Sequence, residues 1–139
     1  MIHQPVLSKE VVEYLAPGEN ENIIDCTIGE GGHSLEILKL NKPEGTLLGI
    51  DWDPEQIERA RENLRAYQER VILVNDNYAA LENIMKRQGL ESVSGILLDL
   101  GMSSQQIEKG KGFSFRKDSL LDMRYSPAKT LTAEKIVNQ

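Results

Sequence analysis

A glycine-rich segment between two apolar runs constrains the fold of this chain more than any other feature. Glycines stand at positions 29, 31 and 32, directly after a short apolar run (Ile23 and Ile24) and before a helical pattern of apolar residues. Twenty residues after Gly31, a second apolar run ends at Asp51. A glycine turn from a strand into a helix lets the backbone approach a ligand closely, and a carboxylate after the next strand can accept hydrogen bonds from ribose hydroxyls. This spacing predicts a site for a nucleoside-containing cofactor, although a tight turn without a ligand would leave the same glycine pattern.

Apolar runs and helical patterns alternate along the first hundred residues. They predict strands at 22–27, 46–51, 70–75 and 95–100, and helices at about 34–40, 54–67 and 79–88. Another helix is predicted before the first strand, with Ser8 as its N-cap, and Asp53 is placed to cap the helix that Pro54 opens. Strands that alternate with helices at this spacing predict an α/β fold with right-handed parallel connections.

The pattern changes after Gly101, where the chain becomes polar and glycine-punctuated. Residues 103–127 predict a long loop, and a helix with Thr132 as its possible N-cap begins after it. Residues 109–139 carry 7 basic and 3 acidic side chains, whereas residues 1–108 carry 9 basic and 19 acidic ones. Such a change of sign can mark an anion-binding edge, and a solvated basic tail explains it equally well.

Composition excludes several classes of protein. The 139 residues are 40% hydrophobic and 27% charged, as expected for one soluble domain, and no apolar run approaches the ~20 residues that cross a bilayer. The N-terminus lacks the features of a signal peptide, which predicts a cytoplasmic location without a membrane partner. The single cysteine, Cys26, excludes an internal disulfide, and with only His3 and His33 besides it we predict no metal site.

Two further residues follow predicted strands and are candidates for chemistry. Asp99 ends an otherwise apolar strand, which is where doubly wound sheets place their ligand crevice. Tyr78 closes the loop after the third strand, where its ring could stack on an adenine, although ordinary half-buried packing is an equal alternative. Asp51 could instead be a helix-capping carboxylate, a role that Asp53 fits better.

Six motifs in a fixed order resemble the MraW/RsmH family, which methylates the exocyclic amine of a cytosine in 16S ribosomal RNA. The resemblance covers essentially the whole chain. The motifs are His3-Gln4-Pro5-Val6-Leu7, the segments 25–34, 49–54 and 95–104, Gly112-Phe113-Ser114-Phe115, and Leu121-Asp122-Met123-Arg124.

The resemblance implies S-adenosyl-L-methionine as the cofactor and a Rossmann-like class I methyltransferase sheet. That sheet would be truncated after its fourth strand, because family members are about twice as long. Residues 1–102 would form the cofactor-binding half, and residues 103–139 a polar loop with the start of a helical substrate-binding insertion. The implied cofactor contacts are Gly31, Gly32, His33, Asp51, Tyr78, Asp99 and Gln106.

The resemblance also suggests how RNA would be handled. Asp99 is the candidate for orienting the target amine, and Ser103 and Ser104 could add hydrogen bonds. Phe113 or Phe115 could stack on bases, although both could equally be core residues. Arg116, Lys117 and Arg124 could hold phosphates of 16S ribosomal RNA in the small ribosomal subunit.

Two alternative functions and one interaction are predicted for the chain as a whole. It could be a truncated domain that binds the cofactor without turnover. It could, less readily, be an NAD-dependent oxidoreductase, because a glycine turn and Asp51 suit that cofactor too. Finally, an unpaired apolar edge at the fourth strand predicts a homodimer or another covering chain.

Overall fold

The structure is a computed structural model that describes residues 5–139, except for the side chains of residues 104 and 105. The chain divides into two compact units, one ending at Asp99 and one spanning Leu100–Gln139. This division lies close to the predicted one after residue 102, while the roles predicted for the two regions stay predictions. His3 and Gln4 of the first motif lie outside the described residues.

The first unit is built on a four-stranded parallel sheet with the strand order β3-β2-β1-β4. Its strands are β1 (Ile23–Asp25), β2 (Leu47–Asp51), β3 (Val71–Asn75) and β4 (Gly95–Leu97). Every neighbouring pair is parallel, with Ile24 beside both Leu48 and Ile96. The predicted α/β class is therefore confirmed, although β4 ends three residues earlier than predicted.

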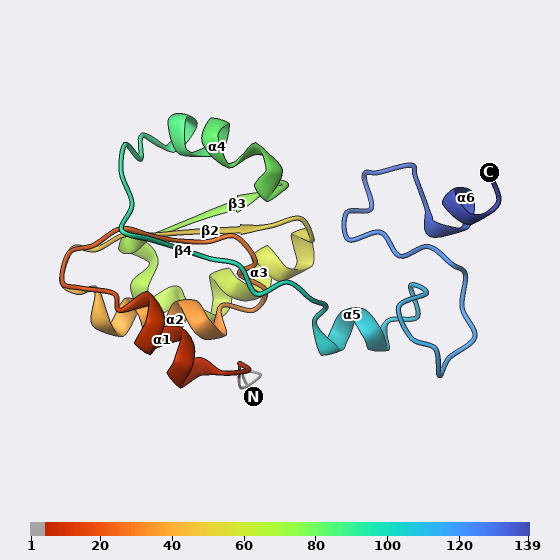
Figure 1. Ribbon diagram of the computed structural model, residues 1–139, viewed down its shortest axis with the longest axis horizontal. Coiled ribbons are helices and arrows are strands. Elements are labelled where there is room, and N and C mark those ends of the chain that lie inside the picture. The colour runs from red at the N-terminus through yellow and green to blue at the C-terminus, as the bar shows by residue number, and fades with distance from the viewer. Residues whose placement is uncertain (1–4) are drawn as a thin grey trace. The chain divides into compact units, whose positions relative to one another are not determined.

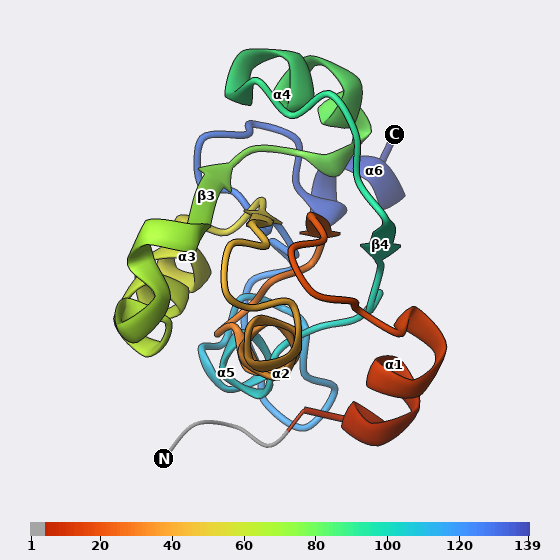
Figure 2. The same cartoon turned by 90° about the vertical axis from the view of Figure 1, so that its left-hand side faces the viewer.

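Helices cover both faces of this sheet (Figures 1 and 2). α1 (Ser8–Leu15), α2 (Gly32–Leu40) and α3 (Pro54–Asn63) lie on one face, and α4 (Leu81–Gln88) lies on the other. Successive strand residues point to opposite faces, so Ile23 and Leu47 pack towards α2 and α3 while Ile24 and Leu48 pack towards α4. Burial on both faces explains why the central strands read as continuous apolar runs.

Capping residues account for three of the predicted helix boundaries. The Asp53 side chain accepts a hydrogen bond from the Glu55 N–H at the start of α3, and Thr132 accepts one from the Lys135 N–H at α6 (Ala133–Val137), which confirms both predicted caps. Gly89, with φ of 69°, ends α4 as predicted.

Two of the predicted helix boundaries are wrong. Ser8 is the first residue of α1 and not its N-cap, because its hydroxyl donates to the Pro5 carbonyl at 2.8 Å while Leu7 occupies the cap position. The helix expected to reach residue 67 ends at Asn63, and a 3-10 helix, η1 (Arg65–Arg70), follows it.

The second unit is held mainly by polar contacts. Arg124 forms a two-pronged ion pair with Asp122, through Nε to Oδ1 at 2.6 Å and through the second guanidinium nitrogen to Oδ2 at 2.7 Å. The Tyr125 hydroxyl donates to the Gly101 carbonyl, and its ring packs against Phe113 with centroids 5.3 Å apart. The long loop predicted at 103–127 is corrected here, because it contains the short helix α5 (Ser104–Glu108).

Within residues 5–139, no helix is both long enough and apolar enough to span a lipid bilayer.

Candidate functional site

The candidate site lies where the strands of the first unit end. All four strands are parallel, so the segments after β1, β2, β3 and β4 emerge at the same edge of the sheet. These segments carry five of the predicted contact positions in the first unit, namely Gly31, Gly32, His33, Asp51 and Asp99, and Tyr78 follows β3 by three residues.

The glycine turn needs its glycines for two different reasons. Gly29 and Gly31 have φ of 52° and 86°, a left-handed conformation that strains any residue with a Cβ atom. Gly31 is also crowded, because an added Cβ would come within 3.1 Å of the Leu64 side chain. At Gly29, by contrast, an added Cβ would meet nothing nearer than 3.8 Å, which leaves the backbone open to a ligand.

Asp51 joins this turn to the end of β2. One carboxylate oxygen accepts a hydrogen bond from the Gly29 N–H at 3.0 Å, and the other accepts one from the Asp53 N–H at 2.9 Å. Burial raises the pKa of Asp51 above its ordinary value, an effect that these backbone hydrogen bonds oppose. The Trp52 N–H also acts on this carboxylate, which offers about four acceptor positions, so Asp51 can hold the turn and still accept a hydrogen bond from a ribose hydroxyl.

The end of β3 is hydrogen-bonded to the backbone of Asp51. The Asn75 side-chain amide donates to the Asp51 carbonyl at 2.9 Å, and Asn77 caps the short 3-10 helix η2 (Tyr78–Ala80) by accepting from the Ala79 N–H. Tyr78 is 45% exposed, which is compatible both with stacking on an adenine and with the alternative of ordinary half-buried packing. Its stacking role therefore stays a prediction.

Asp99 is held beside the end of β1. Its N–H donates to the Thr27 hydroxyl oxygen at 2.8 Å, and one carboxylate oxygen lies 3.8 Å from His33 Nδ1. The His33 ring is 9% exposed, whereas the Asp99 side chain is 57% exposed. The structure thus places an open carboxylate against a buried imidazole at the N-terminus of α2.

Asp25 is a buried residue of this site to which sequence reasoning assigned no role. Asp25 is 1% exposed at the end of β1, where it accepts a hydrogen bond from the Ser34 hydroxyl at 2.7 Å and one from the Thr27 N–H at 3.1 Å. Burial raises its pKa to about 6, against the lowering effect of those hydrogen bonds. An aspartate inside an apolar strand pattern was the signal that could have revealed this role.

The remaining predicted residues belong to the second unit. Gln106 is buried on α5, where its side-chain oxygen accepts a hydrogen bond from the Ser103 N–H. Arg124 is engaged by Asp122, whose pKa its guanidinium lowers to about 2, while Arg116 stacks over the 95% exposed ring of Phe115. The site roles of Gln106, Arg116, Lys117 and Arg124 remain predictions, and the side chain of Ser104 lies outside the described part of the chain.

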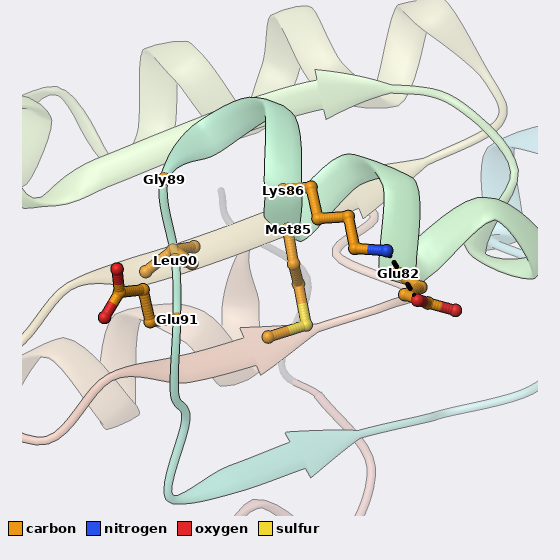
Figure 3. A pocket seen from close by; sticks show the side chains of 6 residues that line it. All are labelled: Glu82, Met85, Lys86, Gly89, Leu90 and Glu91. Atoms are coloured by element: carbon orange, nitrogen blue, oxygen red, sulfur yellow. Dashed lines mark hydrogen bonds and ion pairs between the residues drawn. The ribbon is translucent and has the colours of Figure 1, made fainter.

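A surface hollow of about 510 Å³ lies elsewhere, beside α4 (Figure 3). Its rim includes the Glu82–Lys86 ion pair of 2.7 Å, and Met85 and Leu90 form its apolar part while also packing against the core. None of the predicted cofactor contacts lines it, so the hollow and the candidate site are different surfaces.

Sequence comparison matches the whole chain to one family. A family model described as the MraW methylase family matches residues 1–139. A protein from Dictyoglomus turgidum named Ribosomal RNA small subunit methyltransferase H is 47% identical over 140 residues, which is 99% of this chain and 48% of the relative. The chain therefore spans about half the length of this curated relative.

Structural comparison agrees on the fold. The C-terminal domain of precorrin-6Y C5,15-methyltransferase from Rhodobacter capsulatus is 24% identical, with a TM-score of 0.56 over 71% of this chain and 50% of that one. NSun6 from Pyrococcus horikoshii is 25% identical, with a TM-score of 0.59 over 70% of this chain and 24% of that one. The Rossmann-like arrangement predicted from the sequence is therefore found in solved methyltransferase structures.

Proposed function

Because the chain belongs to the MraW methylase family, we propose that it binds S-adenosyl-L-methionine and transfers a methyl group to ribosomal RNA of the small subunit. Curated relatives carry the name Ribosomal RNA small subunit methyltransferase H, which supports this substrate class. The acceptor in the proposal is the exocyclic amine of a cytosine in 16S ribosomal RNA, as the motif resemblance implies. Such a substrate would place the protein in the cytoplasm.

The observation that carries the proposal is the bond between the glycine turn and the second-strand carboxylate. The Gly29 N–H to Asp51 contact of 3.0 Å brings an open backbone turn and a ribose-binding carboxylate to one place, which fits the nucleoside part of the cofactor. In the proposal, Gly31, Gly32 and His33 line the cofactor and Tyr78 stacks on its adenine. Asp99 completes the set of contacts from the first unit, and Gln106 of the second unit stays a contact that only the resemblance implies.

Charge at this edge favours a cationic cofactor over NAD. Asp51 would suit the ribose of either cofactor, but the open carboxylate of Asp99 lies beside the first residues of α2, where a dinucleotide would place its pyrophosphate, and like charges repel. S-adenosyl-L-methionine carries a sulfonium and an ammonium group, which carboxylates attract. The oxidoreductase alternative is therefore the weaker one.

Each group has a defined task in the proposed reaction. S-adenosyl-L-methionine, held by the glycine turn and Asp51, would supply the methyl group on a positively charged sulfur, which would leave as a neutral thioether. The target cytosine must be unstacked to reach the site. Asp99 accepts a hydrogen bond from the amine, which localises electron density on its nitrogen, and accepts the proton that the methylated nitrogen loses.

Two residues of the second unit suit RNA contacts better than their neighbours. Phe115 is exposed and has Arg116 over its ring, so both can reach a base or a phosphate, whereas Phe113 is engaged by Tyr125. Arg116 and Lys117 would hold phosphates. Arg124 is already paired with Asp122, so its contribution would come through the loop that it braces.

A methyl-transfer assay tests the proposal. The purified chain is incubated with S-adenosyl-L-methionine labelled in its methyl group and with 16S ribosomal RNA, both free and in assembled small subunits. Label on a cytosine amine supports the proposal. Cofactor binding without any transfer supports the alternative that these residues form a cofactor-binding domain without turnover.

A further inference from the structure

The N-terminal segment of the described chain lies against the glycine turn. A Cβ atom added to Gly32 would come within 3.1 Å of the Pro5 ring, and the Ser8 hydroxyl fixes the Pro5 carbonyl at 2.8 Å. His33 Nε2 lies 2.8 Å from the Val6 carbonyl oxygen. Two contacts thus connect residues 5–8 to the first residues of α2, and the Ser8 hydrogen bond fixes the shape of the segment itself.

The Val6 contact determines which nitrogen of His33 carries the proton. A carbonyl oxygen can only accept a hydrogen bond, so Nε2 must be the N–H donor in the neutral imidazole. Nδ1 then carries a lone pair and no proton. This lone pair faces the Asp99 carboxylate, with 3.8 Å between Nδ1 and Oδ2.

When the His33 ring is neutral and Asp99 is ionised, neither group supplies a proton between Nδ1 and Oδ2. The Asp99 carboxylate then keeps its lone pairs for a proton that arrives from outside the pair. Its side chain is 57% exposed, so it has room to move the roughly 1 Å that separates 3.8 Å from a hydrogen bond. Once Asp99 is protonated, its O–H has a ready acceptor in Nδ1.

We propose that His33 is a positioning residue for proton removal: the Val6 carbonyl locks its Nε2–H tautomer, and its Nδ1 then accepts a hydrogen bond from Asp99 after Asp99 has taken the amine proton. The inference rests on the proposed methyl transfer. One proton leaves the methylated nitrogen and one O–H bond forms on Asp99, so the charge of the pair rises by one. His33 stabilises that protonated state and is itself neither consumed nor methylated.

Asp25 is the other titratable group that acts on His33. A positive charge on His33 would lower the pKa of Asp25, so the protonation of one ring and the ionisation of the other side chain affect each other. Asp25 accepts hydrogen bonds from the Ser34 hydroxyl and the Thr27 N–H. The Thr27 hydroxyl oxygen in turn accepts one from the Asp99 N–H. The pH dependence of the His33–Asp99 pair must therefore be measured with Asp25 intact.

The tautomer is the first test, because it needs neither cofactor nor RNA. Nitrogen NMR of the isotope-labelled chain at about pH 8 distinguishes a protonated from an unprotonated imidazole nitrogen, and a His33→Gln sample identifies the His33 signals against those of His3. We expect a protonated Nε2 and an unprotonated Nδ1. A protonated Nδ1 in the neutral ring would overturn the proposal, because it would donate to Asp99 and block the acceptor role.

Two variants separate the two nitrogens of His33 in the transfer reaction. His33→Gln keeps an amide donor near the Val6 carbonyl and removes the Nδ1 acceptor, whereas His33→Asn keeps an acceptor near Nδ1 and loses the Val6 contact. At saturating cofactor and RNA, we expect His33→Gln to slow single-turnover transfer by about tenfold to a hundredfold, with partial recovery in His33→Asn. Equal rates for His33→Gln and the wild type would overturn the proposal.

Failure of the proposed function would look different. A folded wild-type chain that binds no S-adenosyl-L-methionine contradicts the methyl-transfer proposal and the proton role with it, while the tautomer measurement still reports on the Val6 contact. If the wild type binds cofactor but transfers no methyl group, the tautomer alone decides whether His33 Nδ1 can serve Asp99.

Discussion

Asp25 affects both the stability of the fold and the arrangement of the candidate site. It lies fully buried at the end of β1 and reaches the first turn of α2 through Ser34. Its pKa of about 6 in the folded protein exceeds its ordinary value of 3.8, so the folded state binds a proton more tightly than the unfolded state does. The stability that this provides is fully present below about pH 4 and is lost as the pH rises through about 6.

Replacing Asp25 by asparagine should remove this dependence. The two-unit difference corresponds to about 2–3 kcal/mol between the two ends of the window. Urea unfolding at about pH 4 and pH 7 should therefore show that the unfolding free energy falls from the lower to the higher pH, and that it falls more in the wild type than in Asp25→Asn. Parallel behaviour of the two proteins would mean that Asp25 stays ionised in the fold.

The glycine turn offers a matched pair of substitutions. Gly31→Ala and Gly89→Ala both place a Cβ atom at a left-handed residue, with φ of 86° and 69°. Each should lose about 1–2 kcal/mol of stability for that reason. Only Gly31→Ala also pushes on Leu64, so it alone should weaken cofactor binding when each variant is titrated below its own melting temperature. Equal binding by both variants would show that the turn tolerates the shift.

At the level of the elements, local signals in the sequence predicted more than long-range ones did. Asp53 and Thr132 were identified as caps because capping depends on a side chain and the two or three residues after it. Ser8 failed because its hydroxyl donates to Pro5 instead, a contact that belongs to the N-terminal segment and its approach to the glycine turn. The early end of α3 at Asn63 has a similar origin, since the Asn63 amide donates to the Glu30 carbonyl across the site.

The candidate site shows the same division. Asp51 and Asp99 were predicted as site residues from their position at the ends of strands alone, and the structure places both at the same edge of the sheet. The contacts that make them useful were not predicted, because Gly29 to Asp51 and Val6 to His33 span 22 and 27 residues of sequence. Only the fold brings such pairs together.

In the second unit, the Arg124–Asp122 pair is the element that a conservative change should break. Lysine keeps the charge of arginine but cannot form two parallel hydrogen bonds to a carboxylate. In Arg124→Lys, we expect faster hydrogen exchange at the Ala133 and Glu134 amides, which donate to the Asp122 and Leu121 carbonyls. Unchanged exchange there would show that the ion pair does not hold α6 in place.

For the molecule as a whole, the exposed outer edge of the sheet is a surface where another chain can associate. β4 is an edge strand in the described sheet, and Ile96 and Leu98 are 46% and 50% exposed. We propose that a second copy of the chain or another chain covers this edge. Light scattering should show concentration-dependent association that Ile96→Lys suppresses, with Leu120→Lys, at an exposed apolar residue of the second unit, as the control. A monomer at all concentrations would contradict the proposed homodimer.

The central claim is that the ends of β1 to β4 form a site for S-adenosyl-L-methionine, and calorimetric titration tests it most directly. The wild type should bind saturably with one site per chain. Asp51→Ala should lose binding because it removes the ribose acceptor and the tie to Gly29, whereas Asp53→Ala removes only a helix cap, costs about 1 kcal/mol of stability and keeps the backbone N–H that Asp51 uses. Binding by Asp53→Ala and none by Asp51→Ala is the predicted result. Equal binding by all three proteins, or none by a folded wild type, would contradict the claim.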